Sequence, residues 1–246
     1  QGNLLITLIL VALASLVLGM GLPVTASYIV LATLSAPLIF DLISQSQLLT
    51  ALQTQDIPSN VAATLGLFGG DPVVALQEMP LEMKQLIRQE MIDPEMLTGM
   101  LLSAHLIIFW LSQDSNVTPP VCLASFAAAG IAGTPPMATG FTSWKVAKGL
   151  YLVPVLFAYS PLISGSWSER IEVFLWSSMG LYALAGILQW HLERKINLQI
   201  AVLLLLSAVL LMWTPFPIYY HMFGAAILFT IIIVQNRQKP ASVATT

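Results

Sequence analysis

SQDSNVTPPVC (residues 112–122) interrupts a long apolar part of the sequence. It follows LLSAHLIIFWL (101–111) and precedes LASFAAAGIAG (123–133), neither of which contains Asp, Glu, Lys or Arg. Pro119 and Pro120 have no amide hydrogen and disfavour helix in the residues before them, so carbonyls near Ser115 to Val117 lose their helical partners. The stretch therefore predicts a helix that breaks and restarts.

The composition places this break in a membrane. Charged residues make up 9% of the 246 residues, against about 25% in an average soluble domain, and 57% are hydrophobic. The mean hydropathy is +0.83. The apolar runs of roughly 13 to 20 residues suit helices that cross a hydrocarbon layer, not the alternating strands of an outer-membrane barrel. The predicted class is an all-α integral membrane protein.

The first apolar run, Leu4 to Phe40, would be about 55 Å long as one helix and exceeds a single crossing. GMGLP (19–23) divides it into two arms of about sixteen residues, which predicts a re-entrant hairpin over 1–43. Two tightly linked spans are the alternative. The run has no basic residue before it, so a signal peptide is not expected, and we interpret the chain as part of a longer polypeptide.

A polar segment at 44–96 follows the hairpin. It holds seven of the twelve acidic residues but only Lys84 and Arg88 as bases, and we expect a water-facing insertion. Within it, PLEMKQLIRQEMI (80–92) has proline at a first-turn position and apolar residues at helical spacing. It predicts a short amphipathic helix that lies either on the membrane or on the protein.

The remaining segments set the orientation. Residues 97–163 are expected to hold the discontinuous helix, an interfacial helix at 134–149 and a span at 150–163. Further spans are expected at 173–190, 196–213 and 218–235 within a C-terminal region (164–235), before a tail at 236–246. Six bases then fall on one side: Lys145, Lys148, Arg194, Lys195, Arg237 and Lys239. The positive-inside rule makes that side, with the C-terminus, cytoplasmic and the insertion extracytoplasmic.

The two breaks offer matching chemistry. Freed carbonyls, with the Thr118 hydroxyl and the Asn116 amide, are hard oxygen ligands of the type that Na⁺ accepts, and a helix expected to begin near Val121 presents free amides to an anion. In GMGLP, Gly19 and Gly21 allow close backbone approach, and Thr25 and Ser27 follow in the first turns of a new helix. Two facing broken elements are the general plan of ion-coupled secondary transporters.

Asp114 adds an acid at predicted membrane depth, where insertion scales assign a cost of about 2.5 to 3.5 kcal/mol. Its role stays open between an ion ligand, a proton-accepting group and an interfacial acid one turn away. HExxH, GxSxG and phosphate-loop motifs are absent from the sequence, so an enzyme is not expected. A channel and a non-transport membrane scaffold are the alternatives to a transporter.

Three stretches resemble a known family. GMGLPVTASYIVLATLSAPLI (19–39), SQDSNVTPPVCLASFAAAGIAG (112–133) and TPPMATGFTSWKVAKGLYLVPVLFAYSPLI (134–163) are similar to the C-terminal half of the large permease of tripartite ATP-independent periplasmic (TRAP) transporters. The likeness is greatest to fused small- and large-subunit permeases of the type paired with TAXI-class binding proteins, and it covers about two thirds of the chain.

The resemblance implies an inverted-repeat membrane fold in which each half has a re-entrant hairpin and a discontinuous helix. It implies uptake of an organic acid in a bacterial or archaeal cytoplasmic membrane, driven by Na⁺ as coupling ion and without another cofactor. The expected partners are a periplasmic binding protein, the N-terminal half of the permease, small-subunit helices and the lipid bilayer, with no nucleic acid.

The resemblance also assigns residues to a site. The suspected Na⁺ site takes in Gly19, Met20, Gly21, Asn116, Thr118 and Pro119, largely through backbone carbonyls. The carboxylate substrate is expected beside Thr25, Ser27, Asn116 and Val121. Two features depart from the family pattern: the insertion at 44–95 is longer than the usual link, and the first repeat is absent from this chain.

Overall fold

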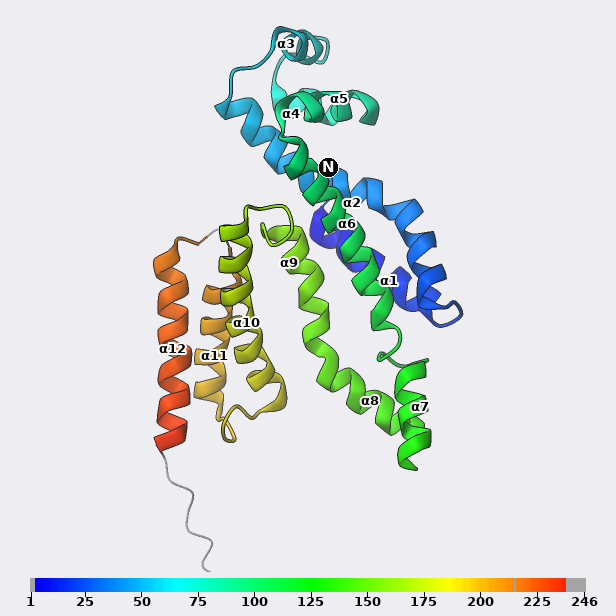
Figure 1. Cartoon of the computed structure of the whole chain (residues 1–246), viewed down its shortest axis with the longest axis vertical. Coiled ribbons are helices and arrows are strands. Elements are labelled where there is room, and N and C mark those ends of the chain that lie inside the picture. The colour runs from blue at the N-terminus through cyan, green and yellow to red at the C-terminus, as the bar shows by residue number, and fades with distance from the viewer. Residues whose placement is uncertain (1–2, 215, 238–246) are drawn as a thin grey trace, which may run out of the picture.

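The computed structural model describes residues 3–214 and 216–237, which form helices joined by loops, with no strand among them (Figure 1). Four of these helices are long and apolar enough to cross a membrane: α2 (Val24–Thr54), α6 (Pro94–Asp114), α10 (Trp167–Gln189) and α12 (Ile218–Arg237). Shorter apolar helices are α1 (Leu4–Gly19), α7 (Leu123–Ala132) and α11 (Leu198–Met212). The predicted all-α membrane class is confirmed.

The first two helices form a hairpin that packs along α6. Asn3 caps α1, because its side-chain oxygen accepts hydrogen bonds from the amides of Leu5 and Ile6 at 3.0 and 3.3 Å. The three helices share one apolar core: Leu8, Val11, Leu31, Ala32, Ala36, Ile39, Ala104, Ile107, Ile108 and Leu111.

Helix α2 is longer than the hairpin arm predicted for it. It continues past residue 43 to Thr54, so the expected boundary at 43 falls inside a helix. The reason is that residues 44–54 contain no glycine or proline, and that Leu48, Ala51 and Leu52 pack into the core of the following segment. The polar composition of 44–54 marks where α2 leaves the apolar core, not where it ends.

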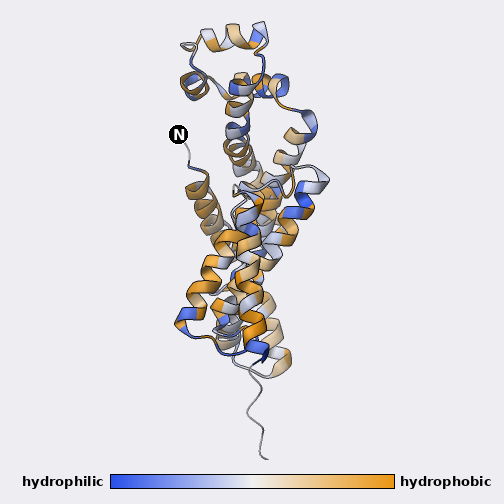
Figure 2. Ribbon diagram, turned by 90° about the vertical axis from the view of Figure 1, so that its left-hand side faces the viewer, coloured by the Kyte–Doolittle hydropathy of each residue, from blue (hydrophilic) through white to orange (hydrophobic). Residues whose placement is uncertain are grey.

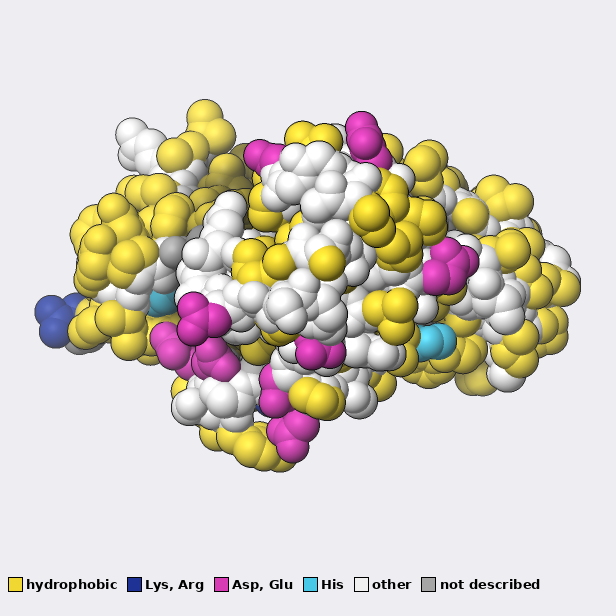
Figure 3. All heavy atoms as spheres, turned by 90° about the horizontal axis from the view of Figure 1, so that it is seen from above, with side chains coloured by type: hydrophobic (Ala, Val, Ile, Leu, Met, Phe, Trp, Pro, Cys, Tyr) yellow, Lys and Arg dark blue, Asp and Glu magenta, His cyan; other side chains and the backbone are white. Residues whose placement is uncertain are grey.

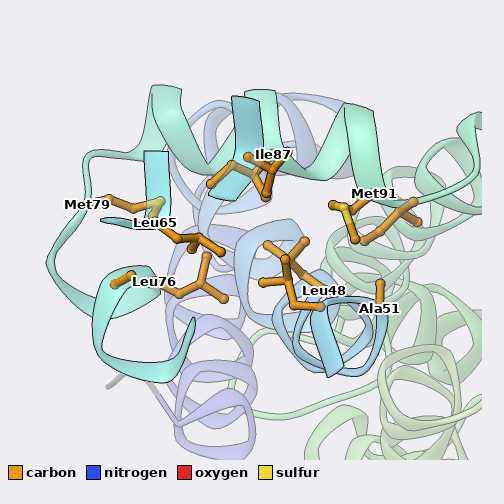
Figure 4. Packing of buried hydrophobic residues seen from close by; sticks show 11 residues of the cluster. Leu48, Ala51, Leu65, Leu76, Met79, Ile87 and Met91 are labelled. Atoms are coloured by element: carbon orange, nitrogen blue, oxygen red, sulfur yellow. The ribbon is translucent and has the colours of Figure 1, made fainter. Parts of the chain in front are cut away.

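The segment 44–96 folds as a small helical unit at one end of the molecule. Helices α3 (Ser59–Gly66), α4 (Pro72–Glu78) and α5 (Leu81–Met91) surround the end of α2 and bury a core of their own (Figures 1 and 4). Asp71 and Asp93 are the side-chain N-caps of α4 and α6. Figure 3 views this end and shows acidic side chains at several places on its surface.

Helix α5 lies on the protein, which decides between the two alternatives left by its sequence. Ile87 and Met91 are buried in the core of the unit, whereas Leu86 is 66% exposed. Arg88, which is 2% exposed, forms an ion pair with Asp41 of α2 and lies over the ring of Phe40 at 5.5 Å. This contact joins the polar unit to the hairpin.

The region after α7 is divided differently from the prediction. Helix α8 (Pro136–Val146) falls within the helix predicted at 134–149, but a 3₁₀ helix, η1 (Ala147–Leu152), and then α9 (Val153–Tyr159) follow it in place of one span at 150–163. Pro154 explains the change, because it has no amide to bond the carbonyl of Leu150. That carbonyl accepts a hydrogen bond from the Trp110 indole at 3.0 Å instead.

Helices α10, α11 and α12 stand side by side and share a separate apolar core. Helix α10 begins six residues earlier than the predicted span at 173–190, because Ser166 and Glu169 form a capping box before Trp167. Hydrophobic residues predominate along these helices in Figure 2, with hydrophilic residues at their ends and in the unit above. The predicted tail lies outside the described residues from position 238 on.

Candidate functional site

The first break is the tip of the hairpin. Helix α1 ends at Gly19, and the amides of Gly21 and Leu22 turn back to the carbonyl of Leu18 at 3.1 and 3.0 Å. Helix α2 begins after Pro23, which provides no side-chain cap. The first-turn amides of α2 therefore have neither intrahelical partners nor a capping side chain.

The second break separates α6 from α7. The amides of Asn116 and Val117 make tight turns to the carbonyls of Gln113 and Asp114, at 3.1 and 3.2 Å, and the two prolines then end the ladder. Helix α7 begins at Leu123, two residues later than predicted, because the prolines prevent helical bonding up to Cys122, its N-cap. Cys122 makes no side-chain cap bond, so α7 also starts with free amides.

The two breaks meet at Gly19. A Cβ atom on Gly19 would overlap the side chain of Ser115, which is itself only 5% exposed. Only glycine therefore fits this position without displacing the start of the second break. The fold brings the hairpin tip against the discontinuous helix, as predicted from their shared chemistry.

Thr118 is tied to a third element. Its hydroxyl is hydrogen-bonded to the Tyr151 hydroxyl of η1 at 2.7 Å, and the residue is 9% exposed. Helix α8 closes on the same break, because a Cβ atom on Gly140 would lie 2.5 Å from the Cys122 sulfur. The break is thus supported by contacts from α1, α8 and η1.

The predicted site residues fall into two groups. Gly19 and Thr118 are buried at the break, and Asn116, Pro119 and Val121 are half-buried there. Met20, Gly21 and Thr25 are exposed at the hairpin tip. Gly21 differs from Gly19, since no heavy atom of another element lies within 4 Å of the place a Cβ on Gly21 would take. Gly21 lies in the tip turn beyond the contact that α1 makes with α6.

Sequence reasoning named Ser115 only for its freed carbonyl, and it missed Tyr151 and Ser15. Ser115 contacts Gly19, Tyr151 holds Thr118, and Ser15 lies fully buried one turn before Gly19. The spacing of Ser15 and Gly19 was the available signal for a shared helix face. No sequence signal paired Tyr151 with Thr118. Within the described residues no group of three His, Cys, Asp or Glu gathers, so a metal ion here would need carbonyl and hydroxyl oxygens.

Comparison with known proteins decides the family. The model of the "Tripartite ATP-independent periplasmic transporter, DctM component" family matches residues 1–163, a range that holds the hairpin, the polar unit, both breaks and α9. The chain belongs to this DctM family. Neither a curated protein nor a solved structure matches it.

Membership of the DctM family makes the chain a permease component of a TRAP transporter, in agreement with the resemblance drawn from its motifs. DctM is a family of transporters and not of enzymes. At the level of the family, its partners are a periplasmic binding protein and a small subunit. Helices α10–α12 lie beyond the matched residues.

Proposed function

We propose that this DctM chain is the C-terminal half of a fused small- and large-subunit permease that takes up an organic acid together with Na⁺. A periplasmic binding protein of the TAXI class delivers the acid. The chain contributes one Na⁺ site and one wall of the anion site, and the N-terminal half of the permease contributes the rest. This proposal deepens the family assignment by naming the coupling ion, the substrate class and the site.

The contact between Gly19 and Ser115 carries the proposal. It joins two places where helix bonding is interrupted, and unwound backbone at membrane depth persists only when buried in protein or lining a cavity. Prolines 119 and 120 deprive the carbonyls of Ser115 and Asn116 of their helical partners. These carbonyls, beside the hairpin tip, supply the hard oxygen ligands that a Na⁺ ion requires.

Two uncapped helix starts favour an anion near the same place. Helices α2 and α7 both begin without a side-chain cap, so their first amides are available to an acceptor. The partial positive charge of a helix N-terminus favours a carboxylate. Thr25, Asn116 and Val121 lie in or beside these two starts and are the proposed contacts of the substrate, whereas the Ser27 side chain is fully buried.

The arrangement along the long axis supports the membrane placement. Figure 1 places the hairpin tip and the α6–α7 break between the levels of the two ends of α12. It also places α8, the loop after α10 and the end of α12, which carry Lys145, Arg194 and Arg237, at the end opposite α3–α5. We therefore propose that the basic end is cytoplasmic and the polar unit extracytoplasmic.

A single substitution tests the site. The full-length permease, reconstituted in proteoliposomes with its binding protein, should show Na⁺-dependent uptake of an organic acid. In Gly19→Ala, the added methyl group pushes the tip away from Ser115, and we expect uptake to fall about tenfold or more, as misplacement by about 1 Å can cost a hundredfold.

Gly130→Ala is the matched control. A Cβ at Gly130 of α7 meets no atom within 4 Å, so this variant should transport like the wild type. Equal uptake in Gly19→Ala and Gly130→Ala would contradict the site. Uptake by the wild type that requires neither Na⁺ nor the binding protein would favour a passive pore.

A further inference from the structure

Three buried polar side chains on the inner faces of α1, α2 and α6 have no hydrogen-bond partner. Asp114 is 2% exposed and both its carboxylate oxygens are unpaired. Ser15 and Ser27 are 0% exposed, and neither hydroxyl is paired. Buried polar groups are almost always satisfied, so three exceptions at one end of one helical core require an explanation.

The register of the helices brings Ser15 and Asp114 within one helical turn of each other along the helix axes. Helices α1 and α6 pack along each other and both end at the contact between Gly19 and Ser115, so they run in the same direction. Ser15, four residues before Gly19, is therefore level with Leu111, which belongs to the shared core. Asp114 is about 4.5 Å further along α6, between the levels of Ser15 and Gly19, and its side chain tilts back toward the helix N-terminus.

Ser27 approaches from the opposite arm of the hairpin. It lies four residues beyond Pro23, one turn after the tip, and shares a helix face with Leu31 of the same core. Because α2 starts at the tip, the Ser27 side chain tilts back toward the tip. Ser15, Ser27 and Asp114 thus extend the apolar core by one polar layer at its tip end.

The other buried serines of α2 and α6 show that these hydroxyls differ. Ser44, Ser103 and Ser112 donate hydrogen bonds to carbonyls four residues back in their own helices, at 2.7, 2.9 and 2.8 Å. This is the usual way for serine to be satisfied in a helix. Ser15 and Ser27 sit in regular helices and do not use it, so their lone pairs and hydrogens are free for another ligand.

No positive side chain of these helices compensates Asp114. Helices α1, α2 and α6 contain neither Lys nor Arg, and the one histidine among them, His105, is hydrogen-bonded to Tyr28 at 3.1 Å. The ion pair found in the described residues, Arg88–Asp41, lies at the other end of the hairpin arm. An uncompensated buried carboxylate is costly, and a bound cation removes that cost.

We propose that Asp114, Ser15 and Ser27 form a monovalent-cation site, occupied by Na⁺, separate from the backbone site at Gly19 and Asn116. One carboxylate charge matches one monovalent charge, and the hydroxyls add neutral oxygen ligands. An ion there bridges α1, α2 and α6 and holds the hairpin against the discontinuous helix. The inference rests on the proposed Na⁺-coupled function and adds a second ion position within this chain.

Na⁺ activation of uptake tests the site. The full-length permease with its binding protein is reconstituted, and initial uptake is measured against Na⁺ concentration. Asp114→Asn should raise the half-saturating Na⁺ concentration about tenfold or more, the equivalent of about 1.4 kcal/mol, and lower the Hill coefficient. Ser15→Ala and Ser27→Ala should raise it by about threefold, as expected for neutral ligands.

Two matched controls separate this site from general damage. Ser112→Ala removes a buried hydroxyl that is already satisfied by Ile108, and Glu90→Gln removes an exposed acid of α5. Both should leave the Na⁺ response unchanged. A second measurement covers variants that do not transport: Na⁺ should raise the melting temperature of the purified wild type, and this rise should shrink in Asp114→Asn.

Several outcomes would overturn the inference. A wild-type Na⁺ response in Asp114→Asn, either in uptake or in thermal stabilisation, contradicts it. The inference is also contradicted if uptake by Asp114→Asn changes its pH dependence but keeps the wild-type Na⁺ response, because a proton then occupies the site. Wild-type uptake that ignores Na⁺ altogether has a different meaning, since it removes the proposed coupling itself.

Discussion

Thr118 illustrates how single contacts shape the site. Its hydroxyl is hydrogen-bonded to that of Tyr151, which fixes its orientation and still leaves an acceptor lone pair for an ion at the break. The same hydrogen bond links the unwound segment to η1, whose own irregular bonding follows from Pro154. Pro119 and Pro120 thus leave backbone carbonyls without helical partners, and the hydrogen bond between Thr118 and Tyr151 holds this unwound segment in place.

Thr118→Val and Tyr151→Phe should each lower the melting temperature of the purified permease, because each leaves one hydroxyl without its partner. The net loss is about 1 kcal/mol for either change, and the double variant should lose no more than either single one. Thr142→Val, on the exposed face of α8, is the control. Additive losses in the double variant would show that the hydroxyl pair contributes nothing.

Among the elements, α2 and α5 show how the polar unit is attached. Helix α2 extends from the hairpin tip into the unit, where Leu48, Ala51 and Leu52 form part of its core. Arg88 of α5 then pairs with Asp41 of α2, and both groups are largely withdrawn from solvent. Helix α2 and this ion pair therefore connect the polar unit to the hairpin.

Arg88→Met should loosen α5, because it leaves the Asp41 carboxylate partly buried without its partner, at a cost of about 3 kcal/mol. Hydrogen exchange of residues 81–91 should increase, while that of α10–α12 stays unchanged. Lys84→Met, on the same helix but outside the described ion pair, should have little effect. Adding Asp41→Leu to Arg88→Met should restore protection, and failure to do so would contradict the pairing.

Over the whole molecule, the two ends differ in charge, and the apolar helices lie between them. The acidic unit of α3–α5 stands at one end, and the basic residues of α8, the α10–α11 loop and α12 stand at the other (Figure 1). The apolar helices between them carry both breaks. This polarity agrees with the multi-pass membrane placement of a TRAP permease, and it makes the proposed orientation measurable.

Cysteine accessibility measures that orientation. Cys122 is the one cysteine of the chain and is buried, so Cys122→Ser provides the background. Leu67→Cys, at a position 76% exposed in the polar unit, should react with a membrane-impermeant thiol reagent added to intact cells. Lys195→Cys, at the basic end, should react only after permeabilisation. The reverse pattern would invert the proposed topology.

The amino-acid sequence by itself determined the class and the places of interruption. Few charges and long apolar runs specify membrane helices, and these are properties of composition. GMGLP and NVTPP end helices wherever they occur, because glycine and proline act on the backbone next to them. Their motifs also carried the TRAP resemblance that the family match confirms.

Only the tertiary structure decided which groups meet. Gly19 and Ser115, Thr118 and Tyr151, and Arg88 and Asp41 are each separated by more than thirty residues, and local propensity contains no information about such pairs. The extension of α2 to Thr54 depends on burial of its apolar residues in the core that they form with α3–α5. The polar layer of Ser15, Ser27 and Asp114 likewise exists only because three helices, each unremarkable alone, pack with their tip ends together.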